Sequence, residues 1–453
     1  MTSAWRAFED GLGVILDSPI GMIRMNSRVS MNPASLQAAL AFEQAEYVRR
    51  NPRSAEMAAA AAIYLPGGTT RSSLWYDPFP LCMVRGEGSH LVDADGHEYV
   101  DFLGEFTAGI YGHSSPVAKQ AIVSALQDGL NLSAHNHRES HLAAMIGARF
   151  PSMQLLRFTN SGTEANLMAL EAATAFTGRT QTLVFEGAYH GCGLAFGPTS
   201  HRRRTDEFVI APYNDEARTR ALIEAHRGTL AAILVEPMLG AGGCIPGTSE
   251  FLHSLRRSAD ETGVVLIFDE IQTARLSFGG RQQLLGLSPD LTTIGKFFGG
   301  GLAFGCFGGR RDIMQLFDPR RPNALSHSGT FNNNTLTMAA GAAALRALTA
   351  ENLDRLNERG ERLRQSILSL FETLAVPFTV TGLGSIMNIH PLGPPATVAD
   401  LRKLLFFDLL GSGIYMASRG LIALSLAVTD EEIARLLQTL KACLEKHRPL
   451  LRN

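Results

Sequence analysis

Short apolar segments alternate with helix-like segments through the middle of the chain. Apolar runs occur at 155–159, 182–185, 231–237 and 264–270, and the stretch 161–176 after the first of them is rich in Ala, Leu and Glu. Such alternation is typical of βα units, which build a mostly parallel sheet with helices on both faces. The pattern therefore predicts an α/β fold.

Both ends of the chain have a helical pattern instead. Residues 31–50 show helical spacing, and amphipathic helices predominate from about Ala350 onwards. In the last of these helices, Thr429 and Glu432 have the spacing of a capping box. Its apolar stripe consists of Ile433, Leu436, Leu437, Leu440 and Leu444.

Composition adds a domain count and argues against several classes of protein. The 453 residues, 45% hydrophobic and 19% charged, exceed what one hydrophobic core usually spans, so we expect about two or three domains. A net charge of -2 offers no basic surface for nucleic acid. The five cysteines form no CxxC pair, which favours a reducing, cytoplasmic location over a disulfide framework. No run has the roughly 18 apolar residues of a membrane-spanning helix, and the charged N-terminus argues against a signal peptide.

Three groups of residues follow the ends of predicted strands, which is where α/β sheets bind ligands. The first group is Ser161, Gly162 and Thr163, between a predicted strand and a predicted helix. The backbone N–H groups and the dipole at a helix start suit a phosphate, and the two hydroxyls add donors. The alternative is that Ser161 only caps the helix.

The other two groups are single charged residues, Asp269 and Lys296. A carboxylate at the end of an apolar run needs a facing cation or proton donor, unless it simply reaches water. A desolvated lysine loses its proton more readily and becomes a nucleophile, whereas the alternative is a lysine whose amine reaches water from a strand end. A nucleotide-binding P-loop would need Gly at position 290 and Ser or Thr at 297, where the chain has Asp290 and Phe297.

Together the three groups predict pyridoxal 5′-phosphate (PLP) as the cofactor. PLP carries a phosphate, a ring nitrogen that must stay protonated, and an aldehyde that condenses with an amine. Asp269 would keep the ring nitrogen protonated. Lys296 would hold the aldehyde as a Schiff base and, once a substrate amine displaces it, would move the proton.

Six motifs occur in an order that resembles class III, fold-type I PLP-dependent aminotransferases, and the resemblance covers about residues 60–440. It implies a homodimer with active sites at the subunit interface. It also implies a large PLP-binding domain over 89–350 and a smaller α+β domain from both termini, formed by part of 1–88 and by 351–453. The motifs are NSGTEAN, GAYHG, VEP, FDEIQT, TIGKFFGGG and SGTFNNN.

The resemblance assigns roles to individual positions. It implies that Lys296 is the Schiff-base lysine, that Asp269 is the partner of the ring nitrogen, and that Glu105 and Tyr111 line the substrate pocket. The remaining implied cofactor contacts are Ser161, Gly162 and Thr163 on the phosphate, Thr330 on the phosphate of the neighbouring subunit, Tyr189 stacked on the ring, and Gln272 near the phenolic oxygen. Without the family context, Tyr189 and Thr330 would be read as an ordinary packed aromatic and an ordinary loop hydroxyl.

Two departures separate the chain from the glutamate-1-semialdehyde aminomutases, which are part of the same family. In those enzymes Ser-Pro-Val-Arg follows PGG. This chain instead has the sequence PGGTTRSSLWY, with Leu74 at the place of that arginine and Arg71 three residues earlier. They also carry a glutamate before the last strand, near the position of Arg419 in SRGLIALSLA. Both changes resemble the β-phenylalanine aminotransferases, as do the segments PFPL, GEGSHLVDADGHEY, EFTAGIYGH and LLFFDLL.

The resemblance and the charge logic together predict the reaction. A transaminase takes an amino donor and a keto-acid acceptor in turn, and arginine grips a carboxylate with two hydrogen bonds. We therefore expect Arg71 to hold the carboxylate of a β-amino acid and Arg419 the α-carboxylate of an acceptor such as 2-oxoglutarate or pyruvate, in a ping-pong cycle. The alternatives are surface or helix-pairing arginines, and an aminomutase or another class III ω-amino acid or amine transaminase. A non-catalytic protein with the PLP fold is a further alternative, which intact Lys296 and Asp269 argue against.

The segment HNHRESH contains three histidines, His135, His137 and His141, at spacings that could suggest a metal. We predict no metal site there.

Overall fold

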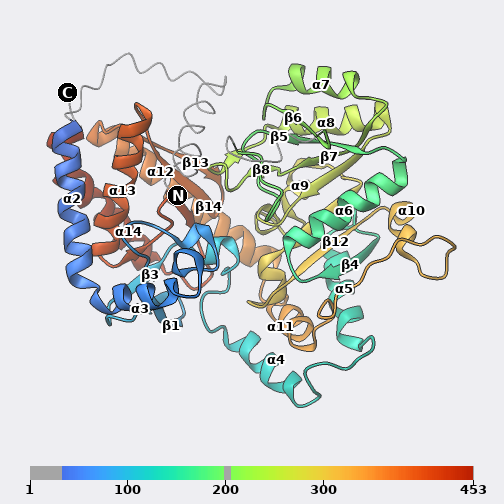
Figure 1. Ribbon diagram of the computed structural model, residues 1–453, viewed down its shortest axis with the longest axis horizontal. Coiled ribbons are helices and arrows are strands. Elements are labelled where there is room, and N and C mark those ends of the chain that lie inside the picture. Colours follow the sequence, from blue (N-terminus) through green and yellow to red (C-terminus); the bar gives the residue numbers. More distant parts are fainter. Residues whose placement is uncertain (1–32, 198–205, 452–453) are drawn as a thin grey trace. The chain divides into compact units, whose positions relative to one another are not determined.

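The computed structural model describes residues 33–197 and 206–451, which fall into two compact units (Figure 1). Unit 1 comprises 116–358 with 382–384, and unit 2 comprises the described residues up to 115 with 359–381 and those from 385 onwards. Unit 2 is thus built from both ends of the chain. The assignment of 1–88, 89–350 and 351–453 to domains stays a prediction.

A seven-stranded sheet is the centre of unit 1. All neighbouring strands in it run parallel except β12, which is antiparallel to both of its neighbours. Its strands β7 and β10 read LAAILV and VLIFD, and every residue of both is buried, as expected for parallel strands covered on two faces. In spatial order the strands are β4 (Leu155–Thr159), β12 (Gly305–Gly309), β11 (Leu291–Gly295), β10 (Val265–Asp269), β7 (Leu230–Val235), β5 (Gln181–Phe185) and β6 (Phe208–Ala211).

Helices pack on this sheet, and α6 (Gly162–Thr177) contacts five of its strands. Four of the five buried residues of α6 are alanines, whose small side chains let the helix approach the strands closely. Helix α8 (Ser249–Thr262) packs against β10, and α7 (Glu216–Ala225) packs against β6 and α8. The predicted α/β fold with a mostly parallel, helix-covered sheet is confirmed. The buried alanines of α6 are Ala165, Ala169, Ala172 and Ala173.

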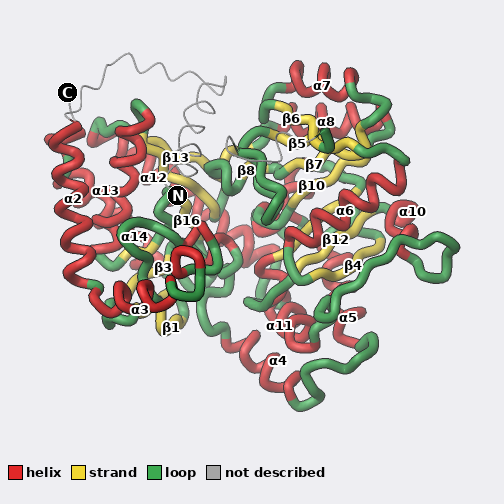
Figure 2. The backbone as a smooth tube through the Cα atoms, in the orientation of Figure 1, coloured by secondary structure: helices red, strands yellow, loops and turns green. Residues whose placement is uncertain are grey.

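Three further helices of unit 1 form a group in which two pack against the third (Figure 2). The two are α4 (Pro116–Leu126) and α5 (His137–Arg149), and the third is α11 (Thr335–Leu345). Helix α5 begins at a capping box, in which the Asn136 side chain accepts from the backbone of the first turn and Glu139 bonds back to the backbone N–H of Asn136.

Unit 2 holds two small sheets. The first has the order β1 (Met83–Glu87), β2 (His90–Asp93), β3 (Glu98–Asp101), β15 (Ile414–Tyr415), and the second has the order β13 (Phe378–Leu383), β14 (Ile386–Pro391), β16 (Leu421–Ala423). The main helices are α2 (Pro33–Arg50), α13 (Pro395–Gly411), α14 (Asp430–Lys446) and most of α12 (Ala350–Leu374).

The predicted capping box at Thr429 and Glu432 is present at the start of α14. Helix α14 buries Leu436, Leu440 and Leu444 of the predicted stripe. Unit 2 thus combines helices with small sheets, as the predicted α+β domain requires.

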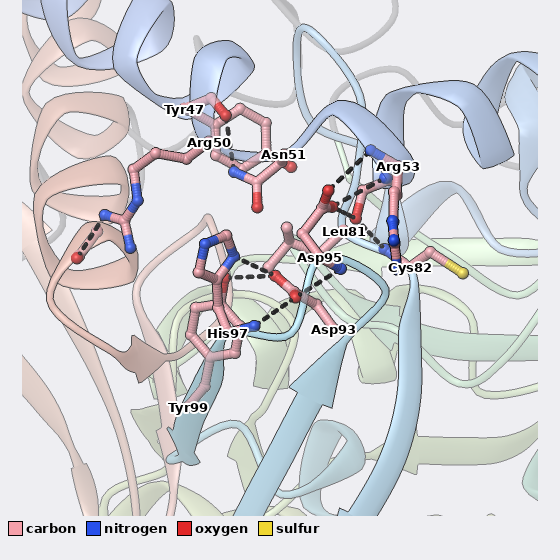
Figure 3. A network of polar contacts seen from close by, with 12 residues as sticks. Tyr47, Arg50, Asn51, Arg53, Leu81, Cys82, Asp93, Asp95, His97 and Tyr99 are labelled. Atoms are coloured by element: carbon pink, nitrogen blue, oxygen red, sulfur yellow. Dashed lines mark hydrogen bonds and ion pairs between the residues drawn. The ribbon is translucent and has the colours of Figure 1, made fainter.

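A polar network joins the α2–α3 corner of unit 2 to the β2–β3 turn (Figure 3). The carboxylate of Asp95 accepts from the backbone N–H groups of Arg53 and Ser54 at 2.8 and 2.9 Å, at the start of α3 (Pro52–Ala62). These N–H groups have no partner within the helix, so Asp95 caps it from a distant part of the chain.

No helix in the described part of the chain is long and apolar enough to cross a membrane.

Candidate active site

Asp269 and Lys296 lie at the ends of two neighbouring parallel strands of unit 1. The register pairs Asp269 of β10 with Thr293 of β11, and Lys296 follows β11 directly after Gly295. All five residues of β11 are buried. Lys296 has a φ of +57°, in the left-handed region that a residue with a Cβ rarely adopts. The two residues therefore lie at the same edge of the sheet, at the ends of neighbouring strands.

Three hydrogen-bonding groups surround the carboxylate of Asp269, which is 3% exposed. The side-chain amide of Asn166 donates at 2.8 Å, the backbone N–H of Ile271 donates at 3.1 Å, and Nδ1 of His190 lies 2.8 Å from Oδ2. These partners offset the cost of burying the carboxylate.

Asn166 and His190 are partners of Asp269 that sequence reasoning missed. Asn166 donates to the backbone oxygen of His190 at 2.9 Å and accepts from the Thr293 hydroxyl at 2.7 Å, so it ties α6 to β11 and to Asp269. Both residues stand within quoted motifs, NSGTEAN and GAYHG, but their partner Asp269 lies 103 and 79 residues further along the chain. Motif membership was the only signal that could have found them.

The start of α6 has the form expected of a phosphate site, and Ser161 does cap the helix. Its hydroxyl accepts from the backbone N–H of Glu164 at 3.2 Å, and the Thr163 hydroxyl accepts from the backbone N–H of Cys192 at 3.1 Å. A Cβ on Gly162 would lie 2.4 Å from the terminal methyl of Ile271, so the Ile271 side chain packs directly against this glycine. A cap and a phosphate site are compatible, because several N–H groups of the first turn lack partners within the helix.

Glu236 is a second buried carboxylate near Asp269. It accepts from the backbone N–H groups of Tyr189 at 2.9 Å and Gly240 at 3.0 Å. Burial raises the pKa of Glu236 to about 7; the nearby His190 opposes the rise and Asp269 adds to it. Glu236 thus fixes the backbone of Tyr189, whose side chain stays 46% exposed and offers an aromatic face to a ligand.

Gln272 and Thr330 complete the predicted cofactor contacts. The amide oxygen of Gln272 is buried with no hydrogen-bond partner among the described residues. Gly240 lies against that amide, since a Cβ on it would come within 2.2 Å of Gln272 Nε2. Thr330 is exposed, and Asn332 two positions later accepts from the Asn160 side chain at 2.9 Å, beside the start of α6.

These observations fit PLP. An amide oxygen that is buried without a partner needs a donor from a bound group. The first turn of α6 offers backbone N–H groups to a phosphate, and the carboxylate at the sheet edge suits a protonated ring nitrogen.

The two predicted substrate arginines lie in unit 2 and share a neighbour. Nη1 of Arg71 donates to Oε1 of Glu105 at 2.7 Å, and both side chains are about half exposed, at 48% and 52%. The Cζ atoms of Arg71 and Arg419 lie 5.8 and 5.5 Å from the centre of the Phe106 ring. Tyr111 is half-buried in the same unit. The structure therefore brings Arg71, Arg419 and Glu105 together around one aromatic ring.

The histidines of HNHRESH do not form a metal-binding group in the structure. The three ionisable side chains within the described residues that come close enough for one are Glu43, Asp408 and His447, in unit 2. The ammonium of Lys446 already bonds to Glu43 and, at 2.7 Å, to Asp408, so a cation of the protein pairs with both carboxylates.

The chain was compared with known families and proteins. The family model Aminotransferase class-III matches residues 72–444. A β-phenylalanine transaminase from Variovorax paradoxus is 48% identical over 93% of this chain and 99% of that protein. A glutamate-1-semialdehyde 2,1-aminomutase from Brevibacillus brevis is 33% identical over 87% of this chain and 98% of that protein.

A solved structure supports the same relationship. The crystal structure of a β-phenylalanine aminotransferase from Variovorax paradoxus superposes with a TM-score of 0.89 at 48% identity, and the match covers 92% of this chain and 99% of that one.

Proposed function

The chain belongs to the class III aminotransferase family, and we propose that within it the amino donor is a β-amino acid related to β-phenylalanine. The chain is a PLP-dependent aminotransferase, which takes its amino group from a donor and passes it to a keto-acid acceptor. The similarity to the Variovorax paradoxus transaminase over nearly the full length of both chains supports the β-amino donor.

The single observation that carries the proposal is the pair of arginines around Phe106. Donor and acceptor each bring a carboxylate, and in a β-amino acid that group lies one carbon further from the amine than in an α-amino acid. A single arginine cannot bind the carboxylate well at both of these distances from the amine. Arg71 would bind the carboxylate of the β-amino donor, and Arg419 would bind the α-carboxylate of an acceptor such as 2-oxoglutarate or pyruvate.

The residues of unit 1 would perform the chemistry. PLP, when bound, supplies an electron-poor ring that stabilises negative charge at the amino-bearing carbon of the substrate. Asp269, fixed by Asn166 and His190, would hold a proton on the ring nitrogen. Lys296 would bind the cofactor and, with its amine released, would move the proton at the substrate carbon.

The other cofactor contacts would be those of the candidate site. The hydroxyls of Ser161 and Thr163 and the backbone at Gly162 would hold the phosphate. Tyr189 would cover the ring, and the side-chain amide of Gln272 would lie near the phenolic oxygen.

A homodimer is part of the proposal, with Thr330 reaching the phosphate of the neighbouring subunit. Large apolar side chains stay exposed along α4 and the loop after it, which a second copy of the chain would cover. Sedimentation of the holoenzyme as a monomer would contradict this. The exposed residues are Val117, Val123, Leu126, Leu130 and Leu132.

None of the five cysteines forms a disulfide, which agrees with a cytoplasmic location.

A donor panel tests the function. β-Amino acids, α-amino acids and simple amines are each assayed with 2-oxoglutarate and with pyruvate. We expect the highest kcat/KM with an aryl β-amino acid. A preference for α-amino acids or for amines without a carboxylate would contradict the proposal, and turnover of a single substrate without a keto acid would favour an aminomutase.

A further inference from the structure

Four consecutive residues of unit 2, beginning three positions after the end of β3, adopt the left-handed backbone conformation. The φ angles of Gly104, Glu105, Phe106 and Thr107 are 55°, 48°, 51° and 79°. Glycine adopts this conformation freely, but three residues with side chains do so at a cost in energy. Such a segment persists only where its surroundings impose it, and such segments concentrate at ligand-binding and switching sites.

The surroundings of this left-handed turn do impose it. The carboxylate of Asp101, at the end of β3, accepts from the backbone N–H of Gly104 at 3.1 Å. The backbone N–H of Ala423 in β16 donates to the oxygen of Phe102 at 2.7 Å. A Cβ on Gly104 would lie 2.8 Å from the backbone oxygen of Ala423. The backbone of the turn is therefore held between two strands, while the exposed side chain of Glu105 can still rotate.

The turn presents two side chains to the arginines of the proposed function. The Phe106 ring lies near both guanidinium groups, whereas the carboxylate of Glu105 binds Arg71 at 2.7 Å. This carboxylate occupies a donor that the carboxylate of a β-amino acid would need. A substrate carboxylate beside it would also meet a like charge.

We propose that Glu105 is the resident counter-ion of Arg71, and that the carboxylate of the donor must displace it to bind. The inference rests on the proposed function for the role of Arg71. Because Glu105 and Arg71 are about half exposed, the carboxylate can swing into water by side-chain rotation alone. The rigid turn keeps it close enough to return when the product leaves.

This exchange makes Glu105 a specificity-determining residue. While Glu105 occupies Arg71, an acceptor carboxylate is directed to Arg419. Only a substrate that reaches Arg71 in good geometry gains enough to replace Glu105. A substrate without a carboxylate leaves the ion pair intact.

The test compares Glu105→Gln with a matched control in the holoenzyme. The control is Glu46→Gln, which removes the same charge from another exposed pair, Glu46–Arg49, also at 2.7 Å. For Glu105→Gln we expect the KM for β-phenylalanine to fall about two- to fivefold, the range for breaking an exposed ion pair. The change falls on KM rather than on kcat, and Glu46→Gln shows no such fall.

Two probes separate competition from a structural effect. The Ki of 3-phenylpropanoate, which has the carboxylate but no amine, should fall by the same factor. The KM for 1-phenylethylamine, which has the amine but no carboxylate, should stay unchanged. A purely structural role for Glu105 predicts the opposite sign, because a disordered Arg71 would bind both carboxylates less well.

The variant Arg71→Ala separates this inference from the proposed function. If Arg71→Ala raises the KM for β-phenylalanine and Glu105→Gln does not lower it, the counter-ion role is overturned while the role of Arg71 stands. If Arg71→Ala leaves that KM unchanged, the role of Arg71 fails and the counter-ion role fails with it. In the Arg71→Ala background, the counter-ion role predicts that Glu105→Gln has no further effect on either carboxylate.

Discussion

The cofactor region of unit 1 and the arginine region of unit 2 handle charge in opposite ways. In unit 1, Asp269 is 3% exposed and has three hydrogen-bonding partners, one on α6 and the others in the segments after β5 and β10. In unit 2, Arg71 and Glu105 are 48% and 52% exposed and are joined by one ion pair. A buried charge allows a single arrangement, because any unpaired state is costly. An exposed pair can exchange partners at little cost.

The contrast matches the demands of the two regions. The cofactor chemistry is the same in every turnover, so its groups profit from rigid placement. The carboxylate sites must accept two different substrates in turn, so their groups profit from being replaceable. Mutations should therefore have large effects in unit 1 and graded, substrate-dependent effects in unit 2.

The largest effect is expected at Lys296. We predict that Lys296→Ala lowers kcat/KM for every donor by at least about 10^3-fold, because it removes both the attachment of the cofactor and the amine that moves the proton. Steady-state kinetics of the purified variant with PLP measure the loss, and the visible absorbance of the lysine-linked cofactor should disappear. Lys441→Ala, at a lysine that is 56% exposed on α14, is the control. Sustained turnover by Lys296→Ala would contradict the proposed role of Lys296 in the cofactor region of unit 1.

Arg71 should show an intermediate and selective effect. Because its side chain is half exposed, we expect Arg71→Ala to cost about 2 kcal/mol, or roughly thirtyfold in kcat/KM for β-phenylalanine, the lower end for a carboxylate left without its partner. The half-reaction with 2-oxoglutarate should change little, and Arg419→Ala should show the reverse pattern. Single-turnover rates of the two half-reactions measure this.

Arg49→Ala, at the exposed arginine that pairs with Glu46, is the control for Arg71→Ala. Equal losses in both half-reactions would show that the two arginines do not sort the two carboxylates.

The sequence predicted best what depends on neighbouring residues. The bounds of β4 agree with the predicted strand, and those of β10 differ by one residue at each end, because buried parallel strands are continuous apolar runs. The capping box of α14 needs only Thr429 and Glu432, three positions apart. The family, the aminotransferase activity and the PLP cofactor are confirmed by the comparisons.

Contacts between distant positions were beyond sequence reasoning. Glu105 and Arg71 are 34 residues apart, and Asn166 and Asp269 are 103 apart, so no local pattern links them. The left-handed turn is equally hidden, because Phe106 and Thr107 have no preference for positive φ and adopt it only under tertiary constraint. The roles of the individual site residues stay predictions.

Glycine substitutions test whether β16 holds the left-handed turn. We expect Gly104→Ala to destabilise the protein by about 2 to 3 kcal/mol, because the new Cβ adds a clash with Ala423 to the strain of a positive φ. Gly178→Ala, at the end of α6, should cost only about 1 kcal/mol, because its φ is also positive but nothing lies within 4 Å. Thermal unfolding of the two holoenzymes measures the difference, and equal shifts would mean that β16 does not hold the turn.

The smallest expected effect concerns a histidine–aspartate pair that each unit contains. His190 and Asp269 lie 2.8 Å apart with 0% and 3% of their side chains exposed, whereas His113 and Asp101 lie 2.9 Å apart with 23% and 6% exposed. The hydrogen bond to Asp101 raises the pKa of His113 above its ordinary value of 6.5, burial opposes the rise, and the charges of Asp101 and Glu105 add to it.

A raised histidine pKa means that the folded protein binds the proton more tightly than the unfolded chain does. The stabilisation is therefore complete below about pH 6.5 and is lost as the pH rises through the higher pKa of the folded protein. We expect the free energy of unfolding of the native protein, relative to His113→Gln, to fall by at most about 1 kcal/mol over that range, since the pair is partly exposed. Melting temperatures of both proteins across the range measure this. If the melting temperatures of the two proteins change with pH in parallel, the charge of His113 does not contribute to stability. Asp101 would then hold the left-handed turn without help from that charge.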